Sequence, residues 1–151
     1  MNQQRMLFDT VTDWCDRNDW SYDVVEEGAA IRSGFSGDNG RFPLYITVSR
    51  DRLMVRSLAP INTPAAKRAV MAEFLTRANY GMAIGNFEMD YNDGEIAYKT
   101  SITSGGQTIS DRMIQDLVFI NCLMMDKYFP GMMQVLYSGV DPEAAVAALE
   151  G

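Results

Sequence analysis

The spacing of apolar positions changes along this chain, and each change predicts a new element. Over residues 3–18 the apolar side chains recur at i, i+4, i+7 and i+8, the spacing of an amphipathic helix: Leu7, Val11, Trp14 and Cys15. Further on, Leu44, Ile46 and Val48 alternate with more polar residues, as in a strand with one buried face. Strand-like segments therefore cover four ranges: 21–26, 29–36, 42–49 and 53–58.

The strand pattern breaks over residues 59–64, and a second helix is expected after it. Thr63 is suited to be the N-cap and Pro64 the first helical residue, and the helix runs to about Ala78. A hairpin follows, with its tip at residues 92–94. The apolar positions of its two strands are Phe87, Met89 and Tyr91 on the first, and Ile96, Tyr98, Thr100 and Ile102 on the second.

A third, long helix is predicted from Ser110 onward. Its expected apolar sector consists of Met113, Leu117, Ile120 and Met124, widened by Ile114, Phe119 and Leu123. Pro130 and Gly131 are expected to kink or interrupt this helix, because proline cannot donate the helical hydrogen bond. Asp141 and Pro142 then open a short last helix that runs through Leu149.

The predicted order is helix, three or four strands, helix, two strands, helix, helix, within a single domain of residues 1–151. Successive hairpins require antiparallel pairing. We therefore expect an α+β fold, in which helices pack on a twisted antiparallel sheet.

Composition and charge restrict the possible partners. The chain has 151 residues, 47% of them hydrophobic and 22% charged, which is typical of a globular domain. The net charge of -7 disfavours nucleic acids and anionic membranes, because their phosphates would be repelled. No apolar run approaches the roughly 20 residues of a membrane span, and the N-terminus does not resemble a secretory signal. A cytoplasmic location is expected.

The chain contains no histidine, which removes an imidazole base, a Ser-His or Cys-His nucleophile pair and histidine metal ligands. We expect a protein that is not an enzyme and that has no cofactor or metal. Catalysis through carboxylates, lysine or tyrosine is the remaining route. Cys15 and Cys122 lie among apolar neighbours in helical patterns, which favours buried free thiols over the alternatives of a disulfide or a reactive thiol.

Three short strings resemble functional motifs without meeting their requirements. Residues 90–95 resemble half of an EF-hand loop, but the glycine comes one position early and the closing glutamate is missing. Residues 34–40 are rich in glycine but lack the spacing of a phosphate-binding loop. Glu88 and Asp90 share one face of a strand, where solvated acids are a simpler explanation than acid–base catalysis.

The chain has eleven methionines, several of them in its last third. Methionine fills irregular cores and also suits surfaces that adapt to a partner. Neighbouring methionines on one helix cannot both point into the same core, so one of each pair is expected to face elsewhere. Both roles stay open at this point. The candidate partner-binding residues are Met124, Met125, Tyr128, Met132, Met133 and Leu136.

With this order of elements, the chain resembles the YbjN-type family within the broader type III secretion chaperone-like fold. The similar segments are the helix that ends at Asn79-Tyr80, the hairpin of residues 85–98, and the end of the chain from Asp126 to Ala145. The resemblance covers about residues 64–147, and residues 1–60 only through the order of elements. It implies a two-layer α+β domain, often dimeric, in bacterial proteins described as regulators, without known catalytic residues.

We therefore hypothesise an interaction module, chaperone-like or regulatory, that acts as a homodimer and binds a segment of a partner protein at a sheet edge or an apolar helical surface. The alternative is a sensor that binds an apolar small molecule between the helices and the sheet. That alternative requires a closed pocket lined by Trp14, Phe74 or Phe87.

Overall fold

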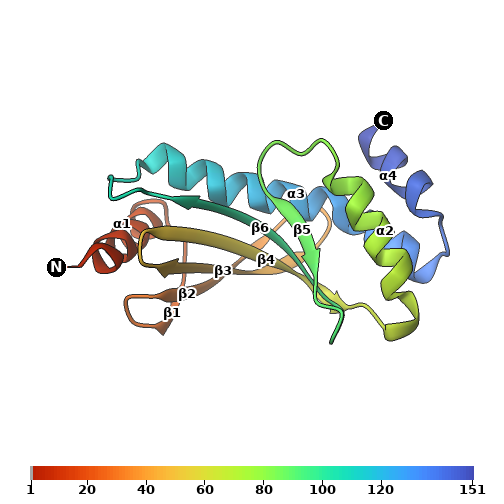
Figure 1. The fold of residues 1–151 in the computed structure, drawn as a ribbon, viewed down its shortest axis with the longest axis horizontal. Helices are drawn as coiled ribbons and strands as arrows, with labels where there is room; N and C mark the ends of the chain where they lie inside the picture. The colour runs from red at the N-terminus through yellow and green to blue at the C-terminus, as the bar shows by residue number, and fades with distance from the viewer. Residues whose placement is uncertain (1) are drawn as a thin grey trace.

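The structure is a computed structural model that describes residues 2–151. Its elements follow the predicted order, with four strands before the second long helix (Figure 1). They are α1 (Gln3–Arg17), β1 (Asp23–Glu26), β2 (Ala30–Ser36), β3 (Arg41–Ser49), β4 (Arg52–Asn62), the 3-10 helix η1 (Ala65–Lys67), α2 (Arg68–Asn79), β5 (Asn86–Met89), β6 (Glu95–Thr103), α3 (Asp111–Tyr137) and α4 (Pro142–Glu150).

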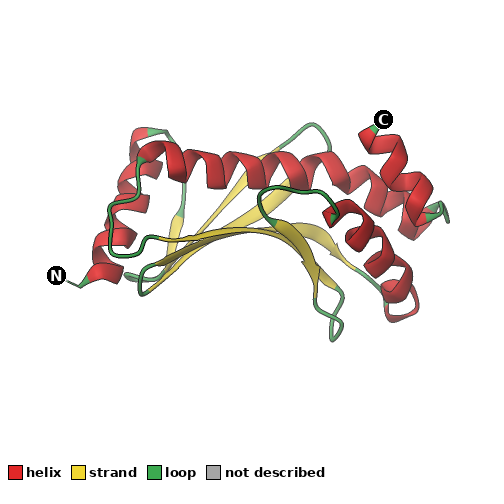
Figure 2. Ribbon diagram, turned by 45° about the horizontal axis from the view of Figure 1, so that its top comes forward, coloured by secondary structure: helices red, strands yellow, loops and turns green. Residues whose placement is uncertain are grey.

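The six strands form one antiparallel sheet in the order β1-β2-β3-β4-β6-β5. β3 shows why the sequence pattern works: Phe42, Leu44, Ile46 and Val48 are buried, and the residues between them are more exposed. The four α-helices lie on the face that these buried residues share, and α3 runs across the sheet (Figure 2). Within residues 2–151, the opposite face carries no helix. The predicted α+β fold is confirmed.

Two hydrophobic clusters fill the space between the helices and the sheet. One lies under α1 and the first half of α3 and is centred on Trp14, Leu44 and Val55. The other lies under α2, α4 and the second half of α3 and contains Phe74, Tyr98 and Met132. The predicted apolar positions of the first helix, from Leu7 to Cys15, are all buried.

A buried polar group separates these clusters along α3. Asn121 is fully buried, and its Nδ2 donates to the main-chain carbonyls of Val55 and Tyr98, both at 2.9 Å. Its Oδ1 accepts a hydrogen bond from the Ser57 hydroxyl. The hydroxyl of Thr100 in turn donates to the carbonyl of Leu117 at 2.8 Å. Because an unpaired buried polar group is costly, these bonds favour one position of α3 on the sheet.

The start of the second helix differs from the prediction. β4 continues to Asn62 through Pro60, where its register with β6 is irregular and a missing N–H is tolerated. Thr63 does not cap a helix: its N–H donates to the carbonyl of Gly94 at 2.8 Å, which keeps it against the β5–β6 turn. Pro64 precedes η1, and α2 begins only at Arg68.

The hairpin and the third helix also differ from the sequence expectation. β5 ends at Met89, so Tyr91 lies in the turn and is exposed. On α3, Met113, Phe119 and Leu123 are exposed, whereas Leu117 and Ile114 are buried as expected. Three residues outside the expected sector complete the buried side: Val118, Asn121 and Met125. The helix is rotated relative to the expected apolar sector because a polar residue, Asn121, occupies the middle of its inner face.

Pro130 does not interrupt α3, which continues as one helix of 27 residues. Proline cannot donate to the carbonyl four residues earlier, which belongs to Asp126. Asn39 in the β2–β3 loop supplies the missing donor, since its Nδ2 lies 2.9 Å from that carbonyl oxygen. The Asp126 carboxylate also accepts from the main-chain N–H groups of Asp38 and Asn39, at 3.0 and 2.8 Å.

Candidate partner-binding surfaces

The groups most suited to chemistry are used structurally. Burial raises the pKa of the Cys15 thiol to about 11 and that of the Cys122 thiol to about 12, so both are protonated at neutral pH. Glu88 pairs with Lys99 at 3.0 Å, and Asp90 accepts from the N–H of Asn92 within the hairpin turn. Among residues 2–151, no group of three or more His, Cys, Asp or Glu is arranged to hold a metal ion.

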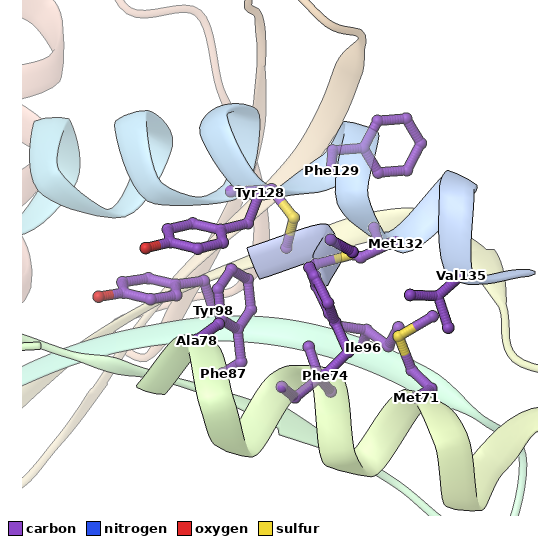
Figure 3. Close-up of a cluster of buried hydrophobic side chains, with 14 of the residues drawn as sticks. Met71, Phe74, Ala78, Phe87, Ile96, Tyr98, Tyr128, Phe129, Met132 and Val135 are labelled. Atoms are coloured by element: carbon purple, nitrogen blue, oxygen red, sulfur yellow. The ribbon is translucent and has the colours of Figure 1, made fainter. Parts of the chain in front are cut away.

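Four of the six predicted partner-binding residues lie inside the molecule. Met125, Tyr128, Met132 and Leu136 are at most 8% exposed. Figure 3 shows Tyr128 and Met132 among the buried side chains, close to Phe87 and Phe74. Met124 and Met133 keep partial exposure. One methionine of each neighbouring pair therefore faces the core and the other faces away from its centre, as expected.

The aromatic residues that would have to line an apolar ligand pocket are packed. Trp14, Phe74 and Phe87 are 1%, 0% and 3% exposed. Phe87 contacts the rings of Tyr98 and Tyr128 edge-on, with ring centres 4.8 and 5.6 Å apart. None of the better-formed pockets of residues 2–151 is lined by these three residues. A small-molecule sensor was expected to have a closed pocket lined by one of these residues, and residues 2–151 do not form such a pocket among those described.

One edge of the sheet is covered by a side chain. At the edge strand β5, Asn79 Nδ2 donates to the carbonyl of Phe87 at 3.0 Å, and Asn79 Oδ1 accepts from the N–H of Phe87 at 2.7 Å. The carboxamide of Asn79 thus occupies both main-chain groups of Phe87, in the middle of the edge with which another strand would pair. Sequence reasoning placed Asn79 at a helix end and did not detect this role, because nothing local to Asn79 indicates which strand lies opposite it.

The other edge is open. All four residues of β1 are exposed, and Val24 and Val25 are 47% and 59% exposed. The register between β1 and β2 shifts between Val24 and Glu26, so Val25 has no partner in β2. An exposed edge with apolar side chains can accept a further strand.

A second apolar surface lies on the outer side of α3. Phe119 is 42% and Leu123 is 63% exposed, one helical turn apart. The Phe119 ring stacks on that of Trp20, with ring centres 6.5 Å apart. We refer to Trp20, Phe119 and Leu123 as the outer α3 surface.

These features define an α+β domain with the type III secretion chaperone-like fold. The chain belongs to the YbjN family, whose description is "Putative bacterial sensory transduction regulator" and which matches residues 7–133. The resemblance read from the sequence is thereby confirmed, and it extends further into the first third of the chain than the motifs indicated. The similar C-terminal residues beyond 133 lie outside the match.

Two solved structures show the same fold. YbjN from E. coli superposes with a TM-score of 0.60 at 14% identity, over 79% of this chain and 85% of that protein. A chain of the HopA1–SchA chaperone–effector complex gives a TM-score of 0.56, also at 14% identity, over 89% of this chain and 98% of its own length. No curated protein sequence matches the chain. No helix within residues 2–151 is long and apolar enough to cross a membrane.

Proposed function

We propose that this protein is a cytoplasmic, non-enzymatic interaction module, chaperone-like or regulatory, that holds an extended segment of a partner protein. The observation that carries the proposal is the asymmetry of the sheet edges: Asn79 covers β5, whereas β1 is exposed along its whole length. Membership of a family of regulators and the shared fold with a chain of a chaperone–effector complex support the same reading.

The mode of binding is strand addition to β1. Main-chain hydrogen bonds would hold the partner segment, and its side chains would contact Val24 and Val25. β1 has only four residues and begins and ends with an acid, Asp23 and Glu26. A short, charged edge resists unspecific pairing, so a bound segment has to fit it.

The test compares two exposed aliphatic residues near opposite edges. Val25→Asp places a charge on the β1 edge, and Ile84→Asp is the matched control, since Ile84 is 47% exposed in the loop before β5. Partners are captured from lysate on each variant and identified by mass spectrometry. We expect one set of proteins to be captured by both the wild type and the Ile84→Asp variant. The Val25→Asp variant should no longer capture these proteins. Equal capture by all three proteins, or loss from both variants, contradicts strand addition at β1.

Hydrogen exchange gives an independent measurement on a captured complex. Partner binding should slow the exchange of amides in residues 23–26, because they become hydrogen-bonded, and leave residues 86–89 unchanged. Protection confined to other parts of the chain would place the partner elsewhere.

We further propose a homodimer formed through the outer α3 surface. A helix of 27 residues is about 40 Å long, and a two-fold contact would bury Phe119 and Leu123 of both copies. Leu123→Glu should shift the sedimentation coefficient at micromolar concentration to that of a monomer, whereas Gln134→Glu, which also places an acid at an exposed α3 position, should not. A wild-type monomer at every concentration contradicts the dimer.

Of the predicted partner-binding residues, Met124 and Met133 retain surface for this role. Met124 is next to Leu123 in the chain, and we propose that it extends the outer α3 surface. Met133→Gln tests the second residue by comparison of partner capture with the wild type. A corresponding change at Met132 would not be informative, because Met132 is fully buried and its loss would disturb the core.

A further inference from the structure

The helix-free face of the sheet contains a hollow between two arginines. Three successive pairs of β2 and β3 point toward this face: Arg32 with Tyr45, Gly34 with Pro43, and Ser36 with Arg41. In the middle pair Gly34 has no side chain and Pro43 has only a compact ring. Above it lies a hollow of about 450 Å³, which is lined by Arg32, Arg41, Tyr45, Pro43 and Pro60, among others.

The shape of this hollow depends on Gly34. A Cβ atom at this position would lie 3.2 Å from the main-chain oxygen of Phe42, and a side chain would project into the hollow. Same-face pairs on a sheet are about 6.7 Å apart, so Arg32 and Arg41 are separated by about 13 Å along the strands. Arginine side chains are long enough for both guanidinium groups to reach the space between them.

The charges of these two arginines are weakly compensated. Among the described residues, Arg41 has no ion pair. Arg32 pairs only with Asp23, at 3.6 Å, and both side chains are more than half exposed. Such exposed pairs contribute little, so Arg32 can exchange Asp23 for another anion.

The whole face differs in charge from the rest of the molecule. Its outward positions carry five cations: Arg32, Arg41, Arg52, Arg56 and Lys99. They carry four acids, Asp23, Glu26, Glu88 and Glu95, and Arg56 and Lys99 are already paired with Glu88 and Glu95. The chain as a whole has 13 Lys and Arg against 20 Asp and Glu, so the excess of negative charge lies on the other surfaces.

From this complementarity we infer that the hollow is a binding site for an acidic protein segment, with a Glu or Asp carboxylate between Arg32 and Arg41. Each guanidinium can donate two parallel hydrogen bonds to a carboxylate. Tyr45, Pro43 and Pro60 offer apolar surface for the neighbouring part of the segment. The site is separate from the β1 edge and goes beyond the function proposed above.

A second copy of this chain is a poor occupant. Two copies that met hollow to hollow would bring their Arg32 and Arg41 side chains together across a two-fold axis. Docking of this face on the acidic helical side of another copy would be head-to-tail, a contact that builds rings or filaments and not a two-fold dimer. The charge pattern therefore favours a different, acidic chain.

The experiment measures the binding of a fluorescein-labelled peptide of alternating glutamate and serine to the full-length protein by fluorescence anisotropy. At about 0.1 M salt the Debye length is about 10 Å, which screens the distant acids but not contacts within the hollow. The variant is Arg32→Gln with Arg41→Gln. The matched control, Arg112→Gln with Lys127→Gln, makes the same change in net charge on α3, on the other side of the sheet.

We expect the wild type and the α3 control to bind the peptide with similar affinity. The Arg32/Arg41 variant should bind it at least about tenfold more weakly. A peptide of glutamine and serine should not compete. No binding by the wild type, or equal weakening in both double variants, overturns the inference. Binding of inorganic phosphate without binding of the peptide also overturns it, since the site then takes a free anion.

Gly34→Val keeps the charges and places a branched side chain in the floor of the hollow. This variant therefore tests the shape of the site separately from its charge. We expect it to weaken peptide binding as the arginine variant does, with an unchanged circular dichroism spectrum. Unchanged affinity in a folded Gly34→Val protein means that the peptide does not enter the hollow and contradicts the site.

Discussion

Asn39 donates a hydrogen bond of 2.9 Å from Nδ2 to the main-chain carbonyl of Asp126, the carbonyl that Pro130 leaves without its helical donor. The β2–β3 loop is thereby fixed to α3 at the point where the proline weakens the helix. The two residues are 87 positions apart in the sequence. The contact explains how α3 remains one helix through Pro130.

This relationship predicts that Asn39 and Pro130 are energetically coupled. Asn39→Ala should lower the free energy of unfolding by about 1 kcal/mol, because the carbonyl of Asp126 loses its donor. In a Pro130→Ala background, the N–H of residue 130 can donate to the Asp126 carbonyl. Asn39→Ala should then lower the free energy of unfolding by about half as much or less. Urea denaturation of the four proteins measures the coupling; additive effects contradict it.

Asn121 predicts a larger effect. Asn121→Ala leaves the Ser57 hydroxyl and two buried carbonyls without this partner and should destabilise the protein by about 2–3 kcal/mol. Gln134→Ala, at an exposed position of the same helix, should change stability by less than about 0.5 kcal/mol. Chemical denaturation compares the two. Similar values for both variants would mean that the buried network does not stabilise the fold.

Asn79 predicts a local effect on an edge strand. Asn79→Ala removes both hydrogen bonds to Phe87, so the amide of Phe87 should exchange with solvent faster by about tenfold. The global free energy of unfolding should fall by only about 1–2 kcal/mol. NMR hydrogen exchange measures the first and urea denaturation the second. An unchanged rate at Phe87 would show that the side chain does not cover this edge.

The thiols of Cys15 and Cys122 should react slowly with a thiol reagent in the folded protein. Because burial raises the pKa of Cys15 to about 11 and of Cys122 to about 12, the reactive thiolate is scarce near neutral pH. We expect a thiol reagent to label the folded protein slowly and the urea-unfolded protein rapidly. Fast stoichiometric labelling of the folded protein would place at least one thiol at an accessible, activated position.

The same shifts predict a loss of stability at alkaline pH. Their folded pKa values lie above the ordinary value of 9.0, so the unfolded chain releases its thiol protons first. The contribution to stability is complete below pH 9.0 and is lost as the pH rises through the folded pKa values of about 11 and 12. Thermal midpoints recorded against pH should fall above pH 9.0, and less steeply in Cys15→Ala with Cys122→Ala. If the thermal midpoints of the wild type and of the double variant fell with the same slope, titratable groups other than these cysteines would cause the loss of stability.

Local sequence was sufficient where one element presents one clear apolar face. The helix that contains Leu7 to Cys15 and the strand that contains Leu44 to Val48 were predicted with their buried sides, because the period of the pattern is set by the backbone geometry. The predicted start of the second helix was wrong, because a hydrogen bond from Thr63 to Gly94 of a distant turn overrides its capping propensity.

The candidate binding residues show the same division. The methionines and aromatics of α3 were predicted to be helical, with a kink or interruption at Pro130, but the sequence could not tell the inner side of the helix from the outer side. The inner side is set by Asn121, whose partners lie in β4 and β6. Once α3 is fixed in this way, Met125 and Met132 are buried and Phe119 and Leu123 are exposed.

The sequence by itself determined the element order, the antiparallel α+β fold and the family, since these follow from periodicity, turn residues and local motifs. Only the tertiary structure decided which sheet edge is open, which side of α3 faces solvent and that two arginines flank a hollow over Gly34. Those features depend on which residues meet across strands and between helix and sheet, and such pairings are set by the packing of the whole chain.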